Sequence, residues 1–484
     1  MTEPRQTPHA TRWTGRILSA TLTVASLAVT ATSFQTGAID ALLSGRGVSL
    51  PAADPVQIEV PSQERSLVCA GPVVAFIPQD VQPRAFGAPD LFGQEGVQSA
   101  LESPGLLNQL GEEGVPDAAL PVLTYSAGSE TAASSVQRWN TETLRGLAVA
   151  PCEDAQAETW LIGGSTITGR QAVLSLANPS DVAATVDVRV FGASGEIDAP
   201  GARGILLPPQ TRRVFSVAGF APEEPSPVLQ VTSSSSPIVA TMHLQVTRGL
   251  QADGMAIVWG GASPSTTHAL PGVLLEQGEV AAALRSSEGY EDLGAALRLL
   301  APAEDTTARI TVHRPLFGDV VSEVSLVAGR VLDVALDELG SSVVAVTVEA
   351  DRPVVAGVRQ FTAEADRTDF SWVAAQEAWT GSSLVSVPPG PEATLSLIGR
   401  AVDTAVVTVD RIAPDGSTVL GRSTLEVSPE RVALLSLGAT GGLYRLETDG
   451  SVSAAVVVRE PGGLGHLGVT LPSSPPEPVT VFTR

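Results

Sequence analysis

The sequence predicts an all-β protein of tandem immunoglobulin-like antiparallel β-sandwich modules behind one N-terminal transmembrane helix. Three observations lead to this prediction. One pattern of apolar strands occurs three times, Gly and Pro number 46 and 36, and an uncharged stretch at 17–39 follows a basic N-terminus. Frequent Gly and Pro suit many short strands, because such strands need turns at regular intervals.

Each copy of the repeat has a leading strand, an alternating run and a closing unit, in that order. The leading strands are LSLANP from Leu174, LRLLAP from Leu297 and LSLIGR from Leu395. The closing units, such as LYRLETDGSVSAA from Leu443, contain two apolar runs, which we interpret as hairpins. Since order and spacing agree as well as composition, we expect three related β modules in a row.

The alternating runs indicate strands with one buried and one wet face. In ATVDVRV, which starts at Ala184, valines alternate with Asp187 and Arg189. A two-residue period of this kind is typical of an antiparallel sheet that packs on a second sheet, so each module is expected to be a β-sandwich. Tight turns are predicted at 192–195, 414–416 and Asp449-Gly450, since Gly and Asp tolerate the required backbone angles.

The domain organisation follows from the repeats and from shifts in composition. We predict a cytoplasmic tail at 1–16, a transmembrane anchor or signal segment at 17–39, a linker at 40–64, an N-terminal β region with a Cys pair at 65–165, β-sandwich 1 at 166–275, β-sandwich 2 at 276–383, and β-sandwich 3 with a C-terminal strand at 384–484. The last strand, at 479–482, is expected to dock on the third module. A helix is a candidate at 280–300, and a short one within 88–114.

The N-terminus predicts export. Arg5, Arg12 and Arg16 precede the uncharged stretch, and a positive flank stays in the cytoplasm, so the bulk of the chain is expected outside a single-pass cell membrane anchor. Ser and Thr interrupt the apolar stretch, and Val29-Thr30-Ala31 offers small residues before a signal-peptidase cut. Cleavage would make the protein secreted instead.

Cys69 and Cys152 are the two cysteines of the chain. In an exported protein they are expected to form one disulfide, which closes a loop of about 80 residues and stabilises by roughly 4 kcal/mol. Two buried free thiols are the alternative. Neither a Cys-x-x-Cys motif nor a Cys/His cluster supports zinc, and we expect no cofactor.

Charge and histidine positions bear on partners and chemistry. The net charge is −23 and Arg supplies all the basic residues, so the surface repels phosphates and we expect no nucleic-acid partner. The five His are too dispersed to share a metal-ligand spacing. We found no nucleophile motif with its partners, and predict that the protein is not an enzyme.

Trp160, Trp259 and Trp372 are the candidate interaction residues, because each comes before or between copies of the repeat. One interpretation is that each ring fills the end of a sandwich core. The other is a row of exposed rings that stack on the faces of sugars.

The stretch from Cys152 to Gly195 carries a family resemblance. A Cys precedes a strand with Trp160, a turn follows at Gly163-Gly164, and the next strand ends in Leu-x-Leu-x-Asn-Pro at Pro179. In these features the chain resembles an uncharacterised domain-of-unknown-function family of actinobacterial secreted or membrane-anchored cell-envelope proteins. The resemblance implies an extracytoplasmic β protein, and it implies no catalytic residues.

Two hypotheses of function follow. The first is a non-enzymatic, membrane-anchored, extracytoplasmic structural or interaction protein of the bacterial cell envelope, whose edge strands bind an unknown envelope protein or polysaccharide. The second is an envelope carbohydrate-binding or carbohydrate-processing protein, which predicts a groove lined by Trp and acidic residues.

Overall fold

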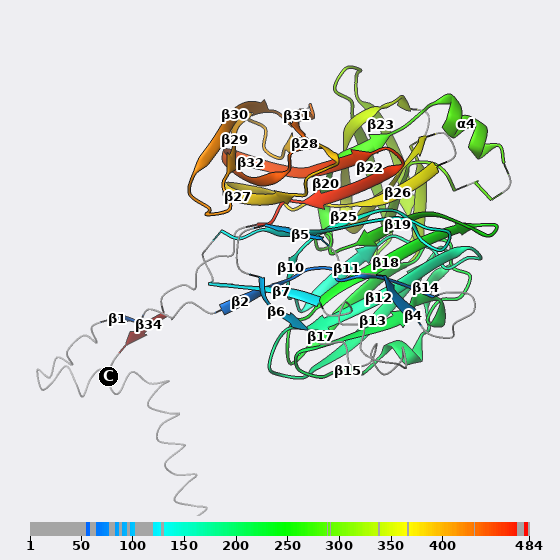
Figure 1. Cartoon of the computed structure of the whole chain (residues 1–484), viewed down its shortest axis with the longest axis horizontal. Coiled ribbons are helices and arrows are strands. Elements are labelled where there is room, and N and C mark those ends of the chain that lie inside the picture. Colours follow the sequence, from blue (N-terminus) through cyan, green and yellow to red (C-terminus); the bar gives the residue numbers. More distant parts are fainter. Residues whose placement is uncertain are drawn as a thin grey trace, which may run out of the picture. The chain divides into compact units, whose positions relative to one another are not determined.

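The computed structural model is built almost entirely from antiparallel β-strands (Figure 1). It describes residues 55–58, 64–76, 83–86, 90–93, 97–101, 120–126, 130–287, 289–290, 292–336, 339–364, 367–429, 431–471 and 479–482. Within these ranges the helices are α4 (Glu279–Arg285), which overlaps the first residues of the helical candidate at 280–300, and two 3₁₀-helices, η2 (Pro200–Ala202) and η3 (Val217–Gly219). The predicted all-β class is confirmed.

Sandwich 1 consists of two antiparallel sheets that enclose one apolar core. The sheets have the orders β16-β12-β18-β19 and β11-β17-β13-β14, with β15 on β13. The strands are β11 (Glu158–Ile162), β12 (Arg170–Asn178), β13 (Ala184–Gly192), β14 (Gly195–Ile197), β15 (Ile205–Leu207), β16 (Thr211–Ser216), β17 (Val228–Ser234), β18 (Val239–Arg248) and β19 (Gln251–Val258). The valines of β13 are buried while Asp187 and Arg189 are exposed, which confirms the predicted alternation.

Sandwiches 2 and 3 follow a different plan, in which one long strand belongs to both sheets. The strands of sandwich 2 are β20 (Ser265–Leu275), β21 (Ala296–Leu300), β22 (Thr306–His313), β23 (Val320–Leu326), β24 (Val331–Ala335), β25 (Ser342–Glu364) and β26 (Arg367–Ala374). The strands of sandwich 3 are β27 (Trp379–Val387), β28 (Glu392–Gly399), β29 (Ala405–Ile412), β30 (Val419–Val427), β31 (Ala433–Gly438), β32 (Gly442–Glu460) and β33 (Gly463–Gly468). The first part of β25 pairs with β20 and β22, and its second part pairs with β21 and β26. β32 divides in the same way between β27 and β29, and then β28 and β33.

The closing units of the repeat are therefore not hairpins, and that prediction is wrong. In the second and third copies the unit is one continuous strand, and in the first it is β17 and β18, which lie in opposite sheets. Asp449 and Gly450 lie inside β32 rather than at a turn. A Cβ on Gly450 would be 2.7 Å from the Cβ of Ala405, so glycine permits the close approach of β32 to β29 as the strand changes sheets.

Two other turn predictions are confirmed. Gly192 pairs with Gly195 across a two-residue turn between β13 and β14. Between β29 and β30, the Asp415 carboxylate accepts hydrogen bonds from the backbone N–H groups of Ser417 and Thr418, at 2.8 and 3.0 Å. These turns depend on neighbouring residues, which is why the local sequence predicts them.

Judged by strand pairing, each sandwich begins before the predicted boundaries at 166, 276 and 384. β11 joins sandwich 1 before residue 166, β20 joins sandwich 2 before residue 276, and β27 includes residue 384. Each of these strands pairs with the closing strand of its copy, which is distant in the chain. The spacing of the repeat therefore carries no information about the first strand.

The N-terminal region forms three small sheets: β10-β2-β7-β6, β5-β8-β9 and β3-β4. The strands are β2 (Glu64–Val68), β3 (Val73–Phe76), β4 (Pro83–Phe86), β5 (Asp90–Gly93), β6 (Val97–Leu101), β7 (Leu120–Ser126), β8 (Ala133–Asn140), β9 (Arg145–Pro151) and β10 (Glu153–Asp154). Cys69 and Cys152, which are 83 positions apart, form the expected disulfide. Where we expected a short helix, the described part of 88–114 contains the strands β5 and β6.

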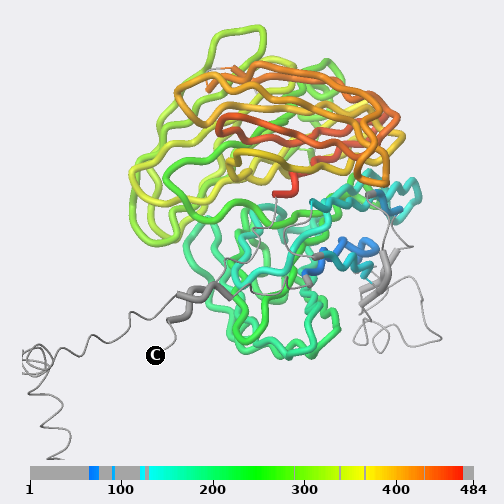
Figure 2. Tube along the Cα trace, turned by 90° about the vertical axis from the view of Figure 1, so that its left-hand side faces the viewer, coloured from blue at the N-terminus to red at the C-terminus, as the bar shows by residue number. Residues whose placement is uncertain are grey.

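The N-terminal region and the three sandwiches form one compact unit, Ser62–Pro476, rather than a row of separate modules. Figure 2 follows this unit from the blue and cyan N-terminal region through green sandwich 1 and green-to-yellow sandwich 2 to the orange and red strands of sandwich 3. β26 of sandwich 2 contacts β19 of sandwich 1, and β20 contacts β28 and β32 of sandwich 3. The modules are thus packed sideways against one another.

A second, small unit pairs β1 (Pro55–Ile58) with β34 (Val479–Phe482). The predicted linker at 40–64 thus contains a strand, and the predicted C-terminal strand at 479–482 is present and pairs with β1. Each strand satisfies the backbone groups along the other's edge. The predicted tail at 1–16 and anchor at 17–39 lie outside the described residues, among which no helix has the length and apolar character to span a bilayer.

Candidate functional site

Four strands from four parts of the chain surround one buried carboxylate, that of Asp369. They are β9 of the N-terminal region, β19 of sandwich 1, β26 of sandwich 2 and β33 of sandwich 3, and each contacts the next in a closed cycle. Asp369 lies on β26 and accepts hydrogen bonds from the backbone N–H groups of Leu147, Met255 and Leu464, at 2.8, 3.1 and 3.0 Å. We call this arrangement the Asp369 junction. One side chain thus connects the N-terminal region with all three sandwiches.

Two glycines allow the carboxylate to reach the backbone. Gly146 and Gly254 have φ of 127° and 113°, and a Cβ on either would lie 2.6 or 3.1 Å from Asp369 Oδ1. Any other residue at these positions would displace the carboxylate. Burial raises the pKa of Asp369 well above its usual range, and the backbone N–H donors oppose that shift.

The four strands of the junction end at a cavity of about 190 Å³, which we call the junction cavity. Its wall contains the ends of β9 and β33 at Pro151 and Gly468, and the residues that follow β19 and β26, Trp259 and Ala375. The side chains of Glu153, Gln376, Glu377, Trp379 and Thr470 also line it. The cavity therefore exists only when all four parts of the chain are assembled.

Glu153 is the most perturbed acid of the junction cavity. Its Oε1 accepts a hydrogen bond from the backbone N–H of Gly260 at 3.1 Å. Burial raises the pKa of Glu153 to about 8, and the charge of Asp154 acts in the same direction. At neutral pH Glu153 is therefore mostly protonated, and a protonated carboxyl can donate a hydrogen bond to a polar ligand.

The three tryptophans predicted from the sequence are all buried, with exposed fractions of 2% for Trp160, 6% for Trp259 and 4% for Trp372. They do not form a row of exposed rings. Trp160 stacks on Phe191 with ring centroids 5.9 Å apart and packs with Leu300 of sandwich 2. Instead of filling the ends of single cores, the rings lie where modules meet.

Trp372 and Trp259 also lie where two modules meet. Trp372 belongs to β26 of sandwich 2 but packs in the core of sandwich 1, where the Arg298 guanidinium lies 4.6 Å from its ring. Trp259 lies nearly parallel to the His466 ring of sandwich 3, at 5.9 Å, and also lines the junction cavity. Of the three predicted residues, Trp259 lines the junction cavity, and Trp372 lines a second cavity, of about 40 Å³, together with Arg170 and Asp292.

Trp379, which we did not single out from the sequence, is a second aromatic residue of the junction cavity. It lies on β27, the first strand of sandwich 3, as Trp160 lies on β11, the first strand of sandwich 1. A comparison of the residues that precede each leading strand would have found it.

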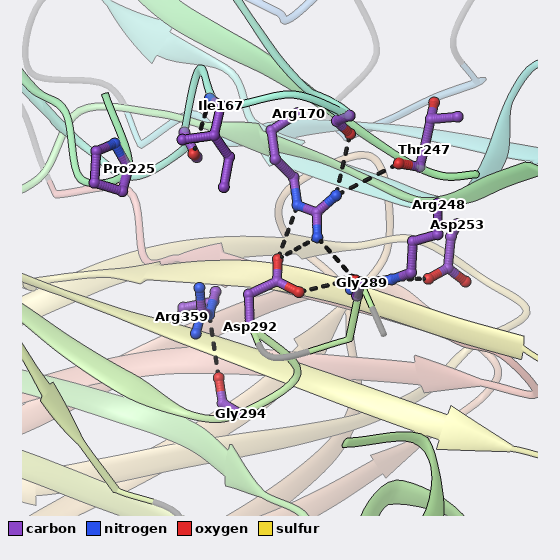
Figure 3. Close-up of polar contacts among 12 residues, drawn as sticks. Ile167, Arg170, Pro225, Thr247, Arg248, Asp253, Gly289, Asp292, Gly294 and Arg359 are labelled. Carbon is purple, nitrogen blue, oxygen red and sulfur yellow. Dashed lines mark hydrogen bonds and ion pairs between the residues drawn. The ribbon is translucent and has the colours of Figure 1, made fainter. Parts of the chain in front are cut away.

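A second polar site joins sandwiches 1 and 2, as Figure 3 shows. Arg170 and Arg248 of sandwich 1 both bind the carboxylate of Asp292, at 2.8 and 2.7 Å, and Arg248 also binds Asp253. Burial alone would raise the pKa of Asp292, but the hydrogen bonds and charges of Arg170 and Arg248 outweigh it and lower the pKa to about 2. We call this cluster the Arg170–Asp292 interface.

Neither site has the arrangement of a metal centre. Within the described residues, no three His, Cys, Asp or Glu side chains are grouped so that they could hold a metal ion. The histidines are separately bonded: His313, for example, contacts Asp319 and Thr347, both at 2.9 Å. What the junction cavity offers is a polar binding surface with two aromatic rings.

These features define an all-β protein of several antiparallel sheets, held by one disulfide and by buried polar junctions. The chain belongs to a family of unknown function, DUF5719, whose profile matches residues 112–402. No curated protein matches the chain. Among solved structures, it is similar to the FN1–FN3 domains of chicken CNTN1, at 12% identity over 68% of this chain and 99% of that chain. The TM-score is 0.09, so that similarity carries no argument about the fold.

Proposed function

We propose that the protein is a non-enzymatic, membrane-anchored, extracytoplasmic structural or interaction protein of the bacterial cell envelope. The observation that supports this best is the Asp369 junction, because it ties four parts of the chain together through backbone donors. Such a body holds its exposed strands at fixed positions relative to one another. That property suits a spacer or a docking platform.

The edge strand β30 is the surface best suited to a partner. It pairs with β29 on one side, and no other described strand pairs with its second edge. Val419 and Leu420 lie on β30 with exposed fractions of 45% and 58%. On the neighbouring strand β29, Val406 is 43% exposed, and Val402 in the preceding loop is 95% exposed. An extended segment of an envelope protein can add to such an edge, with backbone hydrogen bonds for affinity and side-chain contacts for specificity.

Crosslinking in native envelopes tests this proposal. A photo-crosslinking residue at position 420 is expected to capture an envelope protein. The matched control is position 182, because Val182 has a similar exposed fraction, 57%, and lies in sandwich 1. Equal capture at both positions, or none at position 420, would contradict the proposal. Cell fractionation and sequencing of the mature N-terminus test the anchor, and a protein found in the cytoplasm would contradict the location.

The junction cavity favours a second candidate function, the binding or processing of envelope carbohydrate. Trp259 and Trp379 supply aromatic surface, while Glu153 and Gln376 supply polar groups. At about 190 Å³ the cavity is smaller than the roughly 300 Å³ of typical ligand pockets, so it suits one sugar residue rather than a long chain. A glycan array with the purified protein is expected to give a signal that Glu153→Ala weakens, and the absence of any signal would rule this candidate out.

A further inference from the structure

Arg212 is a buried arginine that has no counter-ion among the residues that the structure describes. It lies on β16, the edge strand of sandwich 1, and its exposed fraction is 0%. On the neighbouring strands, Leu174, Leu176, Ala240 and Met242 point into the core of sandwich 1. Residues alternate along a strand, so the side chains between them, such as Ser175, face the opposite way. Arg212 binds on that outer face, which contacts β3 of the N-terminal region.

The hydrogen bonds of Arg212 are incomplete. Its Nε donates to Ser175 Oγ at 2.8 Å, but within the described part of the chain Nη1 and Nη2 have no acceptor. Arg298, which is 1% exposed, shows what a satisfied buried guanidinium looks like in the same protein. It binds both carboxylate oxygens of Asp333, at 2.8 and 2.9 Å, and the carbonyl of Gly164 at 2.9 Å. The two arginines are equally buried, and one of them is left with unused donors.

The neighbouring His243 ring adds no negative charge beside Arg212, and its Nε2 lies 3.5 Å from Thr241 Oγ1. His243 Nδ1 accepts a hydrogen bond from the backbone N–H of Val74, at 3.3 Å, so the ring proton is on Nε2. Burial lowers the pKa of His243 well below its usual value, and the charge of Arg212 lowers it further, so this ring is neutral. Burial also lowers the pKa of Arg212, to about 9, which leaves the guanidinium charged at neutral pH.

We infer that Arg212 holds a small inorganic anion of about the size of chloride, bound between the outer face of sandwich 1 and the N-terminal region. An anion accepts hydrogen bonds without donating any, so it satisfies Nη1 and Nη2 and also compensates the buried charge. A buried water molecule would satisfy the hydrogen bonds but leave the charge without a partner. The inference is independent of the proposed function, because it concerns neither β30 nor the junction cavity.

Anion-dependent stability tests this site. Thermal unfolding of the full chain would be followed in sodium chloride and in sodium gluconate at equal ionic strength, since gluconate is a much larger anion than chloride and Arg212 is fully buried. We expect chloride to raise the unfolding temperature of the unmodified protein in a saturable way, by about 2–4 °C. Arg212→Met should abolish this rise. Arg213→Met, a change at the neighbouring exposed arginine, should retain it.

The buried charge of Arg212 also predicts that the anion decides whether Arg212→Met or the unmodified protein is the more stable. In gluconate, Arg212→Met should unfold at the same or a higher temperature than the unmodified protein, because the variant buries no charge. In chloride the order should reverse. Equal chloride dependence of the unmodified protein and Arg212→Met would overturn the inference.

If Arg212→Met does not fold, a crystal of the unmodified protein soaked in sodium bromide decides the question. We expect an anomalous peak within hydrogen-bond distance of Arg212 Nη1 or Nη2. Density for water alone, or no anomalous peak there, would overturn the inference.

Discussion

The Asp369 junction and the Arg170–Asp292 interface both join modules of this protein, but they do so by different chemistry. Asp369 is 1% exposed and binds backbone N–H groups, whereas the Asp292 side chain is 28% exposed and binds two flexible guanidinium groups. Backbone donors are already fixed by the strands, so the first contact orders few additional side chains. Ion pairs must order long side chains and are weakened by solvent and salt. We therefore expect the Asp369 junction to dominate the stability of the assembled body.

Removal of the Asp369 carboxylate should have the largest effect. Asp369→Ala leaves the buried N–H groups of Leu147, Met255 and Leu464 without acceptors, and each such group costs about 1–3 kcal/mol. We expect a loss of roughly 5 kcal/mol in the free energy of unfolding, measured with urea. If that variant does not fold, Asp369→Asn, which keeps one acceptor, should show a smaller loss. A loss below about 1 kcal/mol for Asp369→Ala would contradict the expectation that the Asp369 junction dominates the stability of the assembled body.

Loss of the disulfide should be the next largest effect. The variant Cys69→Ala/Cys152→Ala is expected to lose about 4 kcal/mol, since the bridge spans 83 positions. Cys152 directly follows β9, which carries Leu147, so this loss should be non-additive with Asp369→Asn by about 0.5–3 kcal/mol. The loss caused by removal of the disulfide should be additive with the loss caused by Asp292→Asn, within about 0.5 kcal/mol. If removal of the disulfide were equally non-additive with Asp369→Asn and with Asp292→Asn, the Asp369 junction and the Arg170–Asp292 interface would not be energetically distinct.

The contribution of the Arg170–Asp292 interface to stability should depend on pH. The pKa of Asp292 is about 2 in the folded protein and near 3.8 when unfolded, so its contribution is present above pH 4 and is lost as pH falls toward 2. Asp292→Asn should cost about 2 kcal/mol at pH 7 and flatten the decline of stability between pH 4 and 2. Asp198→Asn is the control, because the Asp198 side chain is 80% exposed. Equal acid sensitivity of Asp292→Asn and the unmodified protein would contradict this assignment.

The smallest effect is expected from an ion pair that joins no modules. Arg189 and Glu196 lie on one sheet of sandwich 1, with side chains 46% and 40% exposed. Glu196→Gln should change the free energy of unfolding by less than about 0.5 kcal/mol, and 1 M salt should remove the difference. A loss comparable with that of Asp292→Asn would mean that exposure does not separate strong from weak polar contacts here.

Local patterns in the sequence predicted much of the fold. The valines of β13 alternate with Asp187 and Arg189 as expected, and Gly192 and Gly195 flank the expected turn, because both features depend on neighbouring residues. The closing units were misinterpreted because two apolar runs separated by Asp449-Gly450 are equally compatible with a hairpin and with a strand that changes sheets. Only the pairing partners of β32 distinguish these arrangements.

The candidate sites were less predictable. Cys69 and Cys152 were identified because the chain has two cysteines. Asp369, in contrast, lies in the sequence RTDFSW, where Asp and Ser alternate with Phe and Trp, a pattern that predicts a solvent-facing position for Asp369 on a strand. It is buried because β9, β19 and β33 close around β26. Trp160, Trp259 and Trp372 are likewise buried by segments that are distant from them in the sequence.

The sequence by itself thus determined the all-β class, the threefold repeat, the alternation within strands and the cysteine pair. These depend on composition and on contacts between near neighbours, which a linear pattern records. The tertiary structure alone decided that the modules form one body, that Asp369 connects four strands, and that Arg212 is buried with no counter-ion among the described residues. Those features arise where distant segments meet, and burial there determines the environment of each charge.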